Sequence, residues 1–332
     1  MSVIRVNNAH KEYRSASDSK KVMEGFGMSV AQGTMYEVKI LRNISLAFVK
    51  LNRKNIQILP FRYALMGSSG CGKTTLISCL VGINSLDSGD IEIFNDPPRS
   101  HRSRIGYMPQ ENALIAEFTI REMIWFFGTI FGLSRKKIKE RIKFLTDLLE
   151  LPDGDKLIRE CSGGQQRRVS FAITLVHEPE LLILDEPTVG LDPLLRVKIW
   201  DYLLDITMKN QVTVLLSTHY IEEARQSTHI GLMRNGFLIA EDSPQKILRS
   251  TQASNMEEAF LILSKMQENN LTSQNNGSKI IQHIIDVTSN EDLLSKQLFK
   301  GRKTETVAQQ TTLGILFALL TKNFLQIFRN IE

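Results

Sequence analysis

Residues 67–74 read GSSGCGKT, a pattern whose residue types suit phosphate binding. Its glycines let consecutive backbone N–H groups turn toward an anion, its lysine reaches the outer phosphate oxygens, and its threonine offers a hydroxyl to Mg²⁺. A chance match is expected in roughly one in a hundred chains of this length. We therefore predict a nucleotide-phosphate site, with Thr74 as a Mg²⁺ ligand, made of Gly67, Ser68, Ser69, Gly70, Cys71, Gly72, Lys73, Thr74 and Thr75.

An Asp-Glu pair ends the apolar run LLILDEP at residues 181–187, which is typical of a buried parallel strand. Taken alone, such a pair is better explained as negative charge at the start of a helix. In a chain that also has a phosphate loop, Asp185 is suited to hold hydrated Mg²⁺. Glu186 would then face the γ-phosphate and orient or deprotonate the attacking water.

Two further polar residues follow predicted strands. His219 comes after VTVLLST, and Gln110 closes GYMPQ. A lone histidine at a strand end is more often an ordinary surface or core residue than a catalytic one. Because ligands bind at the carboxyl ends of parallel strands, we predict that the His219 strand lies beside the Asp185 strand. His219 would point at the γ-phosphate, and Gln110 would lie at the same edge.

A second glycine-rich stretch, CSGGQQRR at residues 161–168, precedes apolar residues with helical spacing. Ser162 is placed as an N-cap, and a glycine-rich helix start favours anions through its free N–H groups. These residues raise the question of why one chain should have two sites for phosphate.

The elements that would position these residues alternate between strand and helix from Ala64 onward, after residues 1–36 that read as short strands. The other expected elements are two or three helices at 119–151 broken near 132–134, a helix at 194–208, a hairpin at 231–241 turning at Asn235-Gly236, a polar linker at 266–310 and an apolar helix at 311–332.

The composition, with 42% hydrophobic and 23% charged residues, is that of a globular protein with an ample core. Three scattered cysteines indicate a reducing compartment. Neither a secretory signal nor a continuous apolar run of membrane-spanning length is visible. The net charge of +5 equals that of residues 37–63, which hold six basic residues and one acidic residue, so no general basic surface for nucleic acid is indicated.

Together, GSSGCGKTT, GYMPQ, CSGGQQRR, LLILDEPTVGLD and STH resemble, in order and approximate spacing, the nucleotide-binding domain of ABC transporters. The resemblance covers roughly Val3 to Lys265, and the wording around the motifs is similar to the eukaryotic G/H-type half-transporters, especially the arthropod H subfamily. It implies an α/β fold: a P-loop NTPase core with an N-terminal β-subdomain and a helical signature-motif subdomain, formed by residues 1–265. ATP and Mg²⁺ would bind it, with Gln110 and Asp185 among the Mg²⁺ ligands.

In this family two such domains clasp two ATP molecules head to tail, which would explain the second glycine-rich stretch. Ser162, Gly163, Gly164 and Gln165 would bind the γ-phosphate of ATP held by a partner, and Asp192 would couple the two sites. Tyr13 resembles the aromatic residue that stacks on adenine, although an ordinary strand residue fits equally well. The implied partners are a second nucleotide-binding domain and a membrane-spanning domain, at the cytoplasmic face of a membrane. Residues 311–332 resemble the connecting helix that leads toward a membrane domain absent from this chain.

Two features depart from the family pattern. Cys161 stands where the family usually has leucine, and the smaller side chain would cost on the order of 1–2 kcal/mol of packing. Residues 37–63 separate GTMY from ALMG, which join into an ordinary strand when the segment is removed. We expect this atypical insertion to be foreign to the fold.

The resulting hypothesis is an ATP-hydrolysing cassette of a half-transporter that powers export of a lipophilic substrate as a dimer. Two alternatives stay open at this point. The chain could be a soluble ABC ATPase of translation or chromosome maintenance, or an inactive truncated isoform.

Overall fold

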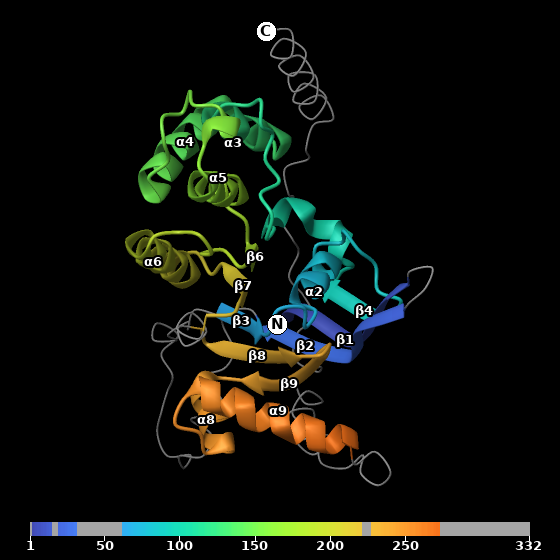
Figure 1. Cartoon of the computed structure of the whole chain (residues 1–332). Helices are drawn as coiled ribbons and strands as arrows, with labels where there is room; N and C mark the ends of the chain where they lie inside the picture. Colours follow the sequence, from blue (N-terminus) through green and yellow to red (C-terminus); the bar gives the residue numbers. More distant parts are fainter. Residues whose placement is uncertain (1, 15–18, 32–61, 221–226, 273–332) are drawn as a thin grey trace, which may run out of the picture.

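The computed structural model describes residues 2–14, 19–31, 62–220 and 227–272 (Figure 1). Along the chain its elements are β1 (Ser2–Arg14), β2 (Ser19–Ala31), β3 (Arg62–Gly67), α2 (Lys73–Leu80), β4 (Ser88–Ile93), the 3₁₀ helix η2 (Pro98–Arg104), β5 (Ile105–Met108), α3 (Ile120–Ile130), α4 (Arg135–Leu149), the 3₁₀ helix η3 (Ile158–Glu160), α5 (Gly163–Leu175), β6 (Leu181–Asp185), α6 (Pro193–Lys209), β7 (Thr213–Thr218), β8 (His229–Arg234), β9 (Phe237–Asp242), α8 (Pro244–Thr251) and α9 (Met256–Thr272).

Two sheets organise the described residues. The larger has the order β5-β6-β7-β3-β8-β9, in which the first five strands are parallel and β9 is antiparallel to β8. The smaller is antiparallel, with the order β2-β1-β4. This is the predicted α/β fold, with a P-loop NTPase core, an N-terminal β-subdomain and a helical subdomain made of α3, α4 and α5 (Figure 1).

The core strands divide their side chains between two hydrophobic clusters. In β6, Leu182 and Leu184 join the cluster that contains α5 and α6, whereas Leu181 and Ile183 join the cluster that contains α2, β1 and β2. Successive side chains of a strand point to opposite faces of a sheet. The α2 helix and the α5 helix therefore cover opposite faces of the larger sheet.

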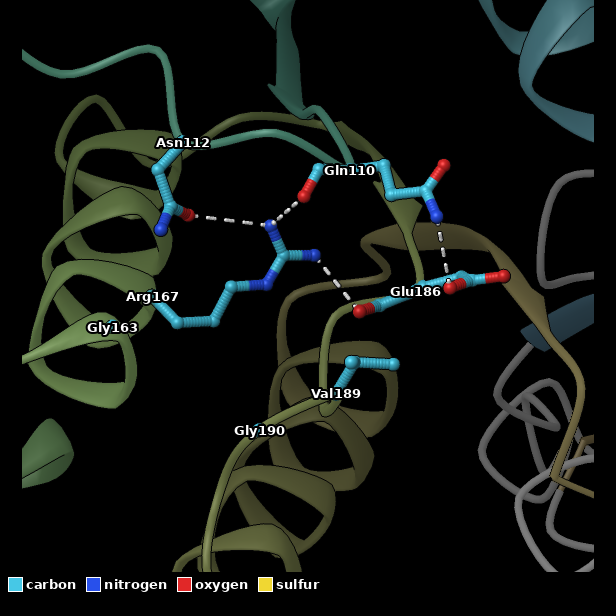
Figure 2. A pocket seen from close by; sticks show the side chains of 7 residues that line it. All are labelled: Gln110, Asn112, Gly163, Arg167, Glu186, Val189 and Gly190. Carbon is cyan, nitrogen blue, oxygen red and sulfur yellow. Dashed lines mark hydrogen bonds between the residues drawn. The ribbon is translucent and has the colours of Figure 1, made fainter.

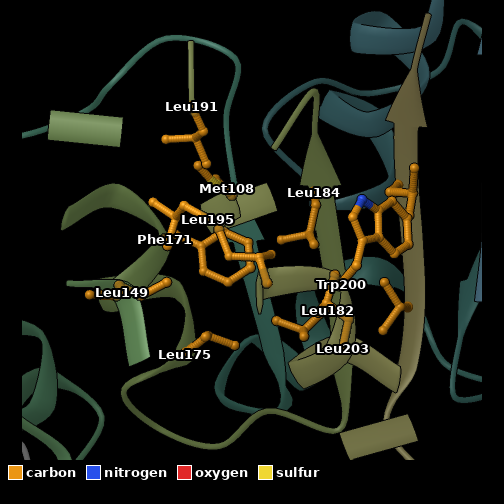
Figure 3. Packing of buried hydrophobic residues seen from close by; sticks show 14 of the residues in the cluster. Met108, Leu149, Phe171, Leu175, Leu182, Leu184, Leu191, Leu195, Trp200 and Leu203 are labelled. Atoms are coloured by element: carbon orange, nitrogen blue, oxygen red, sulfur yellow. The ribbon is translucent and has the colours of Figure 1, made fainter. Parts of the chain in front are cut away.

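Figure 3 shows the packing on the α5 face of that sheet. Phe171 and Leu175 of α5, and Trp200 and Leu203 of α6, meet the β6 side chains there. Burial of each large apolar side chain contributes roughly 1.5–3 kcal/mol to the free energy of unfolding. This cluster fixes α5 and its first turn relative to the end of β6.

Capping residues and turn residues set the ends of several helices and strands. Ser162 and Gln165 form a capping box at the start of α5, and Thr119 and Glu122 form another at α3. The predicted break at 132–134 separates α3 from α4, with Gly132 at a φ of 76°. The hairpin predicted at Asn235-Gly236 joins β8 to β9.

Three expectations are corrected by the structure. The strands of the first 36 residues are 13 residues long each, not short. Helix α9 continues to Thr272, so the linker expected from residue 266 cannot begin there. Arg62 and Tyr63, assigned to the atypical insertion, are the first residues of β3 and are buried.

Three predicted segments lie outside the described residues: most of the insertion (37–61), the rest of the linker (273–310) and the connecting helix (311–332). Within the described part, no helix combines the length and the apolarity that crossing a membrane requires.

The Tyr63 side chain of β3 is buried beside β2 and β9. It is 0% exposed, and its hydroxyl donates to Glu241 Oε1 of β9 at 2.8 Å. The same oxygen accepts from the Ser29 backbone N–H of β2 at 3.3 Å. Burial raises the pKa of the Glu241 carboxyl to about 7. Tyr63 therefore joins the phosphate-loop strand to the contact between the two sheets.

Removing residues 37–63 would leave this contact in place, because Tyr36 would then precede Ala64 as Tyr63 does now. We expect the deletion to raise soluble yield and to keep or raise the midpoint of thermal unfolding. Adding Tyr36→Phe to the deletion should lower the free energy of unfolding by about 1–2 kcal/mol, as Tyr63→Phe should in the full chain, because Glu241 loses the shorter of its two hydrogen bonds. An unfolded deletion variant would show that residues 37–63 belong to the domain.

Candidate functional site

The phosphate loop connects the end of β3 to the start of α2 and faces outward. Ser68, Ser69, Gly70 and Thr74 are exposed. Gly70 and Gly72 have φ values of 76° and 109°, a left-handed conformation that side chains disfavour. Glycine at these two positions lets the loop turn tightly between β3 and α2.

Lys73 lies folded along this loop. Its Nζ atom donates to the carbonyl oxygens of Gly67 at 2.8 Å and Ser68 at 3.1 Å, and lies 3.8 Å from Cys71 Sγ. Burial raises the pKa of the Cys71 thiol. The ammonium group is therefore already at the loop, where an anion would replace neutral carbonyl partners with charged ones.

Asp185 ends β6 and is 1% exposed. Its Oδ1 atom accepts a hydrogen bond from Ser217 Oγ of β7, while Oδ2 is buried without a hydrogen-bond partner in the described part of the chain. A buried carboxylate oxygen without a partner is costly, and a cation would remove that cost. Oxygen is also the ligand that Mg²⁺ prefers. Asp185 thus fits the predicted role of Mg²⁺ ligand.

The Glu186 side chain, which follows β6, contacts side chains that follow β5 and β7. Its Oε2 atom accepts from Gln110 Nε2 at 3.3 Å, and its Oε1 atom lies 3.4 Å from His219 Nδ1 (Figure 2 for Gln110). Its backbone N–H donates to Ser217 Oγ at 3.0 Å. The predicted adjacency of the His219 and Asp185 strands is confirmed by the parallel pairing of β6 with β7. Contact of these side chains with a γ-phosphate stays a prediction.

Arg167 of α5, which the sequence reasoning missed, ties these loops together (Figure 2). The residue is 5% exposed. One terminal nitrogen donates to the Pro109 and Gln110 carbonyls at 2.7 and 2.9 Å, and the other to the Asp185 and Glu186 carbonyls at 2.7 and 2.8 Å. Burial lowers the pKa of this guanidinium, and the charges of Asp185 and Glu186 oppose that effect.

A signal for Arg167 was present in the sequence. Arg167, Ser170, Phe171 and Thr174 follow one face of α5, and all four are buried. A charged residue in register with such a face must find polar partners inside the protein. The spacing of the apolar residues alone does not reveal that Arg167 needs such partners.

A pocket of about 320 Å³ opens beside Arg167 (Figure 2). Its lining residues come from motifs that are far apart in sequence: Gln110, Asn112, Gly163, Arg167, Glu186, Val189 and Gly190. The start of α5 therefore lies near the Glu186 loop, and a Cβ added to Gly164 would lie 3.1 Å from the Gly190 carbonyl oxygen.

The structure does not bring Ser162, Gly163, Gly164 and Gln165 to the phosphate loop of the same chain. Ser162 Oγ accepts from the Gln165 N–H at 3.3 Å, and Gln165 Oε1 accepts from the Ser162 N–H at 3.0 Å. Asp192 Oδ1 accepts from the Leu195 N–H at 3.0 Å and caps α6. Among the described residues, no hydrogen bond joins residues 162–165 to residues 67–75, which lead into α2 on the other face of the sheet.

Tyr13 of β1 is 45% exposed, and its hydroxyl accepts from Asn84 Nδ2 at 3.1 Å. A half-exposed ring fits both predicted roles of Tyr13, stacking on adenine and an ordinary strand residue. Cys161 is buried in the cluster that contains α5, and its thiol donates to the Leu157 carbonyl at 3.4 Å.

Arg167→Ala should lower the free energy of unfolding by roughly 3 kcal/mol or more, because it removes four hydrogen bonds to carbonyl groups that are buried or partly buried. The matched control is Arg168→Ala, since within the described residues Arg168 Nη1 bonds two carbonyls, of Leu149 and Glu150, at the end of α4. We expect the control to cost about 1 kcal/mol in urea unfolding. Equal, small losses for the two variants would contradict the role given to Arg167.

The chain is similar to known proteins in sequence and in fold. Residues 60–189 match the model of the family described as ABC transporter. ABC transporter G family member 23 of Dictyostelium discoideum is 34% identical over 296 residues, which are 88% of this chain and 36% of that protein. Nod factor export ATP-binding protein I of Rhizobium sp. (strain N33) is 37% identical over 204 residues, which are 60% of this chain and 67% of that protein.

The fold is similar to that of a solved dimer, a post-hydrolysis state of the ATP-binding cassette MJ0796 bound to ADP and Pi, at 22% identity and a TM-score of 0.60. That similarity covers 72% of this chain and 98% of the solved chain. The chain spans about a third of the length of the Dictyostelium relatives it matches. Since it covers two thirds of a 37% identical ATP-binding protein, and shares the cassette fold, the chain belongs to the ABC transporter family as one of its ATP-binding cassettes.

Proposed function

We propose that this cassette binds and hydrolyses ATP as the motor of a G/H-type half-transporter, working with a second cassette. The observation that carries the proposal is the position of Glu186 between Gln110 and His219, beside Asp185, whose Oδ2 atom has no hydrogen-bond partner among the described residues. Strands β5, β6 and β7 bring these four side chains to one edge of the sheet, the edge at which β3 passes into the phosphate loop.

ATP would bind with its phosphates in residues 67–75. Lys73 exchanges its bonds to the Gly67 and Ser68 carbonyls for bonds to phosphate oxygens, which are stronger because both partners are charged. Thr74, Asp185 and Gln110 would hold Mg²⁺, which supplies positive charge to the phosphate oxygens. Tyr13 would stack on the adenine.

Glu186 would act on the attacking water. Its carboxylate is held from both sides by Gln110 and His219, so its direction is set before water arrives. Ser217 fixes the backbone behind it and also bonds Asp185, which keeps the metal ligand and the base at a constant separation. His219, nearly half exposed, would meet the γ-phosphate.

The second cassette would complete the site. Ser162, Gly163, Gly164 and Gln165 begin a helix that makes no hydrogen bond to the phosphate loop of its own chain in the described part, and they would bind the γ-phosphate held by a partner. Asp192 lies on the adjoining loop and would couple the two sites. The solved cassette MJ0796, described as dimeric, supports this arrangement.

The work done by the motor would be export of a lipophilic substrate across a membrane, with the cassette on the cytoplasmic face and a membrane-spanning domain as a further partner. A G-family ABC transporter of Dictyostelium that aligns with most of this chain supports the half-transporter assignment. Assignment to the arthropod H subfamily, and the connecting-helix role of residues 311–332, rest on sequence resemblance.

Glu186→Gln should keep ATP binding and stop turnover, because the water loses its base while the phosphate loop and the Mg²⁺ ligands remain. We expect kcat to fall about 10²- to 10⁴-fold, with the Kd for ATP changed only slightly. Glu140→Gln, a change on the exposed face of α4, serves as the control and should hydrolyse ATP at the rate of the parent chain. Near-normal turnover by Glu186→Gln would remove Glu186 from this role.

Two defective chains should complement each other if residues 162–165 act on a partner's ATP. Ser162→Arg disrupts residues 162–165, and Lys73→Ala disrupts the phosphate loop. A dimer made of either variant alone therefore has no working site. A mixed dimer has one site with both parts intact and should recover a substantial share of the normal ATPase rate. If mixed dimers are shown to form but stay inactive, the composite site is refuted.

A further inference from the structure

The tip of the β8–β9 hairpin touches the phosphate loop directly. The Gly236 N–H donates to the Cys71 carbonyl oxygen at 3.0 Å. Asn235 and Gly236 have φ values of 50° and 82°, as a tight two-residue hairpin requires. A Cβ at Gly236 would collide with the Val22 carbonyl oxygen of β2, so only glycine lets the turn come this close.

The strand behind this tip supports the same loop. Gly67, the last residue of β3, pairs with Met233 of β8, and a Cβ at Gly67 would collide with the Met233 carbonyl oxygen. The Met233 side chain also lies against Gly72, where a Cβ would be 2.8 Å from its terminal carbon. The phosphate loop thus lies against residues 233–236 at its beginning, middle and end.

Arg234, within this stretch, binds helix α9 instead. One terminal nitrogen donates to the Ser264 carbonyl at 2.6 Å, and the other forms an ion pair with Glu268. The Arg234 side chain is 22% exposed. Figure 1 shows α9 alongside β9, and Met256 and Ala259 of α9 are buried in the cluster that contains α5 and α6. The hairpin is therefore attached to a helix that is itself anchored in the core.

We propose that Arg234 is a positioning residue for the phosphate loop. By fastening the hairpin to α9, it holds the Asn235–Gly236 turn against Cys71 and so keeps the loop in the shape that phosphates need. A displacement of α9 would reach the phosphate loop through one side chain and one turn, which makes ATP affinity sensitive to the position of this helix. This inference rests on the proposed function.

The test compares two arginine–glutamate pairs of similar exposure. Arg104 and Glu180 are 26% and 57% exposed, close to the 22% and 60% of Arg234 and Glu268. Arg104 donates to Glu180 at 2.7 and 2.6 Å, and no hydrogen bond links it to residues 67–75 in the described chain. Arg104→Ala therefore controls for a general loss of stability.

We expect Arg234→Ala to raise the KM for ATP and the Kd for a fluorescent ATP analogue about three- to tenfold, with kcat within about twofold. Arg104→Ala should leave both constants within about twofold of the parent at a similar loss in thermal midpoint. Arg234→Lys should recover most of the affinity, because its ammonium can still bond the Ser264 carbonyl. Glu268→Ala, which removes one partner only, should give an intermediate shift and serves if Arg234→Ala does not fold.

Equal KM values for the Arg234→Ala and Arg104→Ala chains would overturn the inference, as would an Arg234→Lys chain no better than Arg234→Ala. Lys73→Ala separates this failure from failure of the proposed function. If the parent chain binds the analogue no better than Lys73→Ala does, ATP binding itself is refuted and the inference falls with it.

Discussion

The site depends on one buried guanidinium. Arg167 leaves α5 and bonds carbonyl oxygens that belong to the loop after β5 and the loop after β6. Each of these carbonyls is buried or partly buried, and any of them left without a donor would cost about 1–3 kcal/mol. The rigid planar fork of arginine matches this set of acceptors, whereas a lysine ammonium would not reach them all. The loops that present Gln110 and Glu186 therefore keep their separation only while α5 stays in place.

This constraint gives α5 two tasks. Residues 162–165 form its N-terminal end. Further along the helix, Phe171 and Thr174 are buried in the core. Arg167 lies between these regions. In the proposed composite site, a force on the first turn from a partner's ATP would be passed by Arg167 to the loops that carry Gln110 and Glu186. This connection gives a physical route by which the two regions proposed to bind phosphate, residues 67–75 and 162–165, would act together.

Much of this architecture could be predicted from sequence, because it depends on local patterns. The glycines of 67–74 and the apolar run before Asp185 have strict spacing, and parallel strands bring their carboxyl ends to one edge. Arg167 was missed because its partners are backbone carbonyls, which no residue pattern displays. The end of α9 was missed because a polar composition suggested a linker, whereas Ser264 and Gln267 are buried against the domain. Tyr63 was assigned to an insertion because β2 and β9, beside which it is buried, are distant in sequence.

A crystal structure of the Glu186→Gln chain with ATP and Mg²⁺ would test the composite site most directly. The composite arrangement predicts two copies related head to tail, with each γ-phosphate between Lys73 of one copy and Ser162 of the other. It also predicts that Arg167 keeps its bonds to the Gln110 and Glu186 carbonyls in both copies. ATP held by a single copy, with Ser162 far from any phosphate, would contradict it.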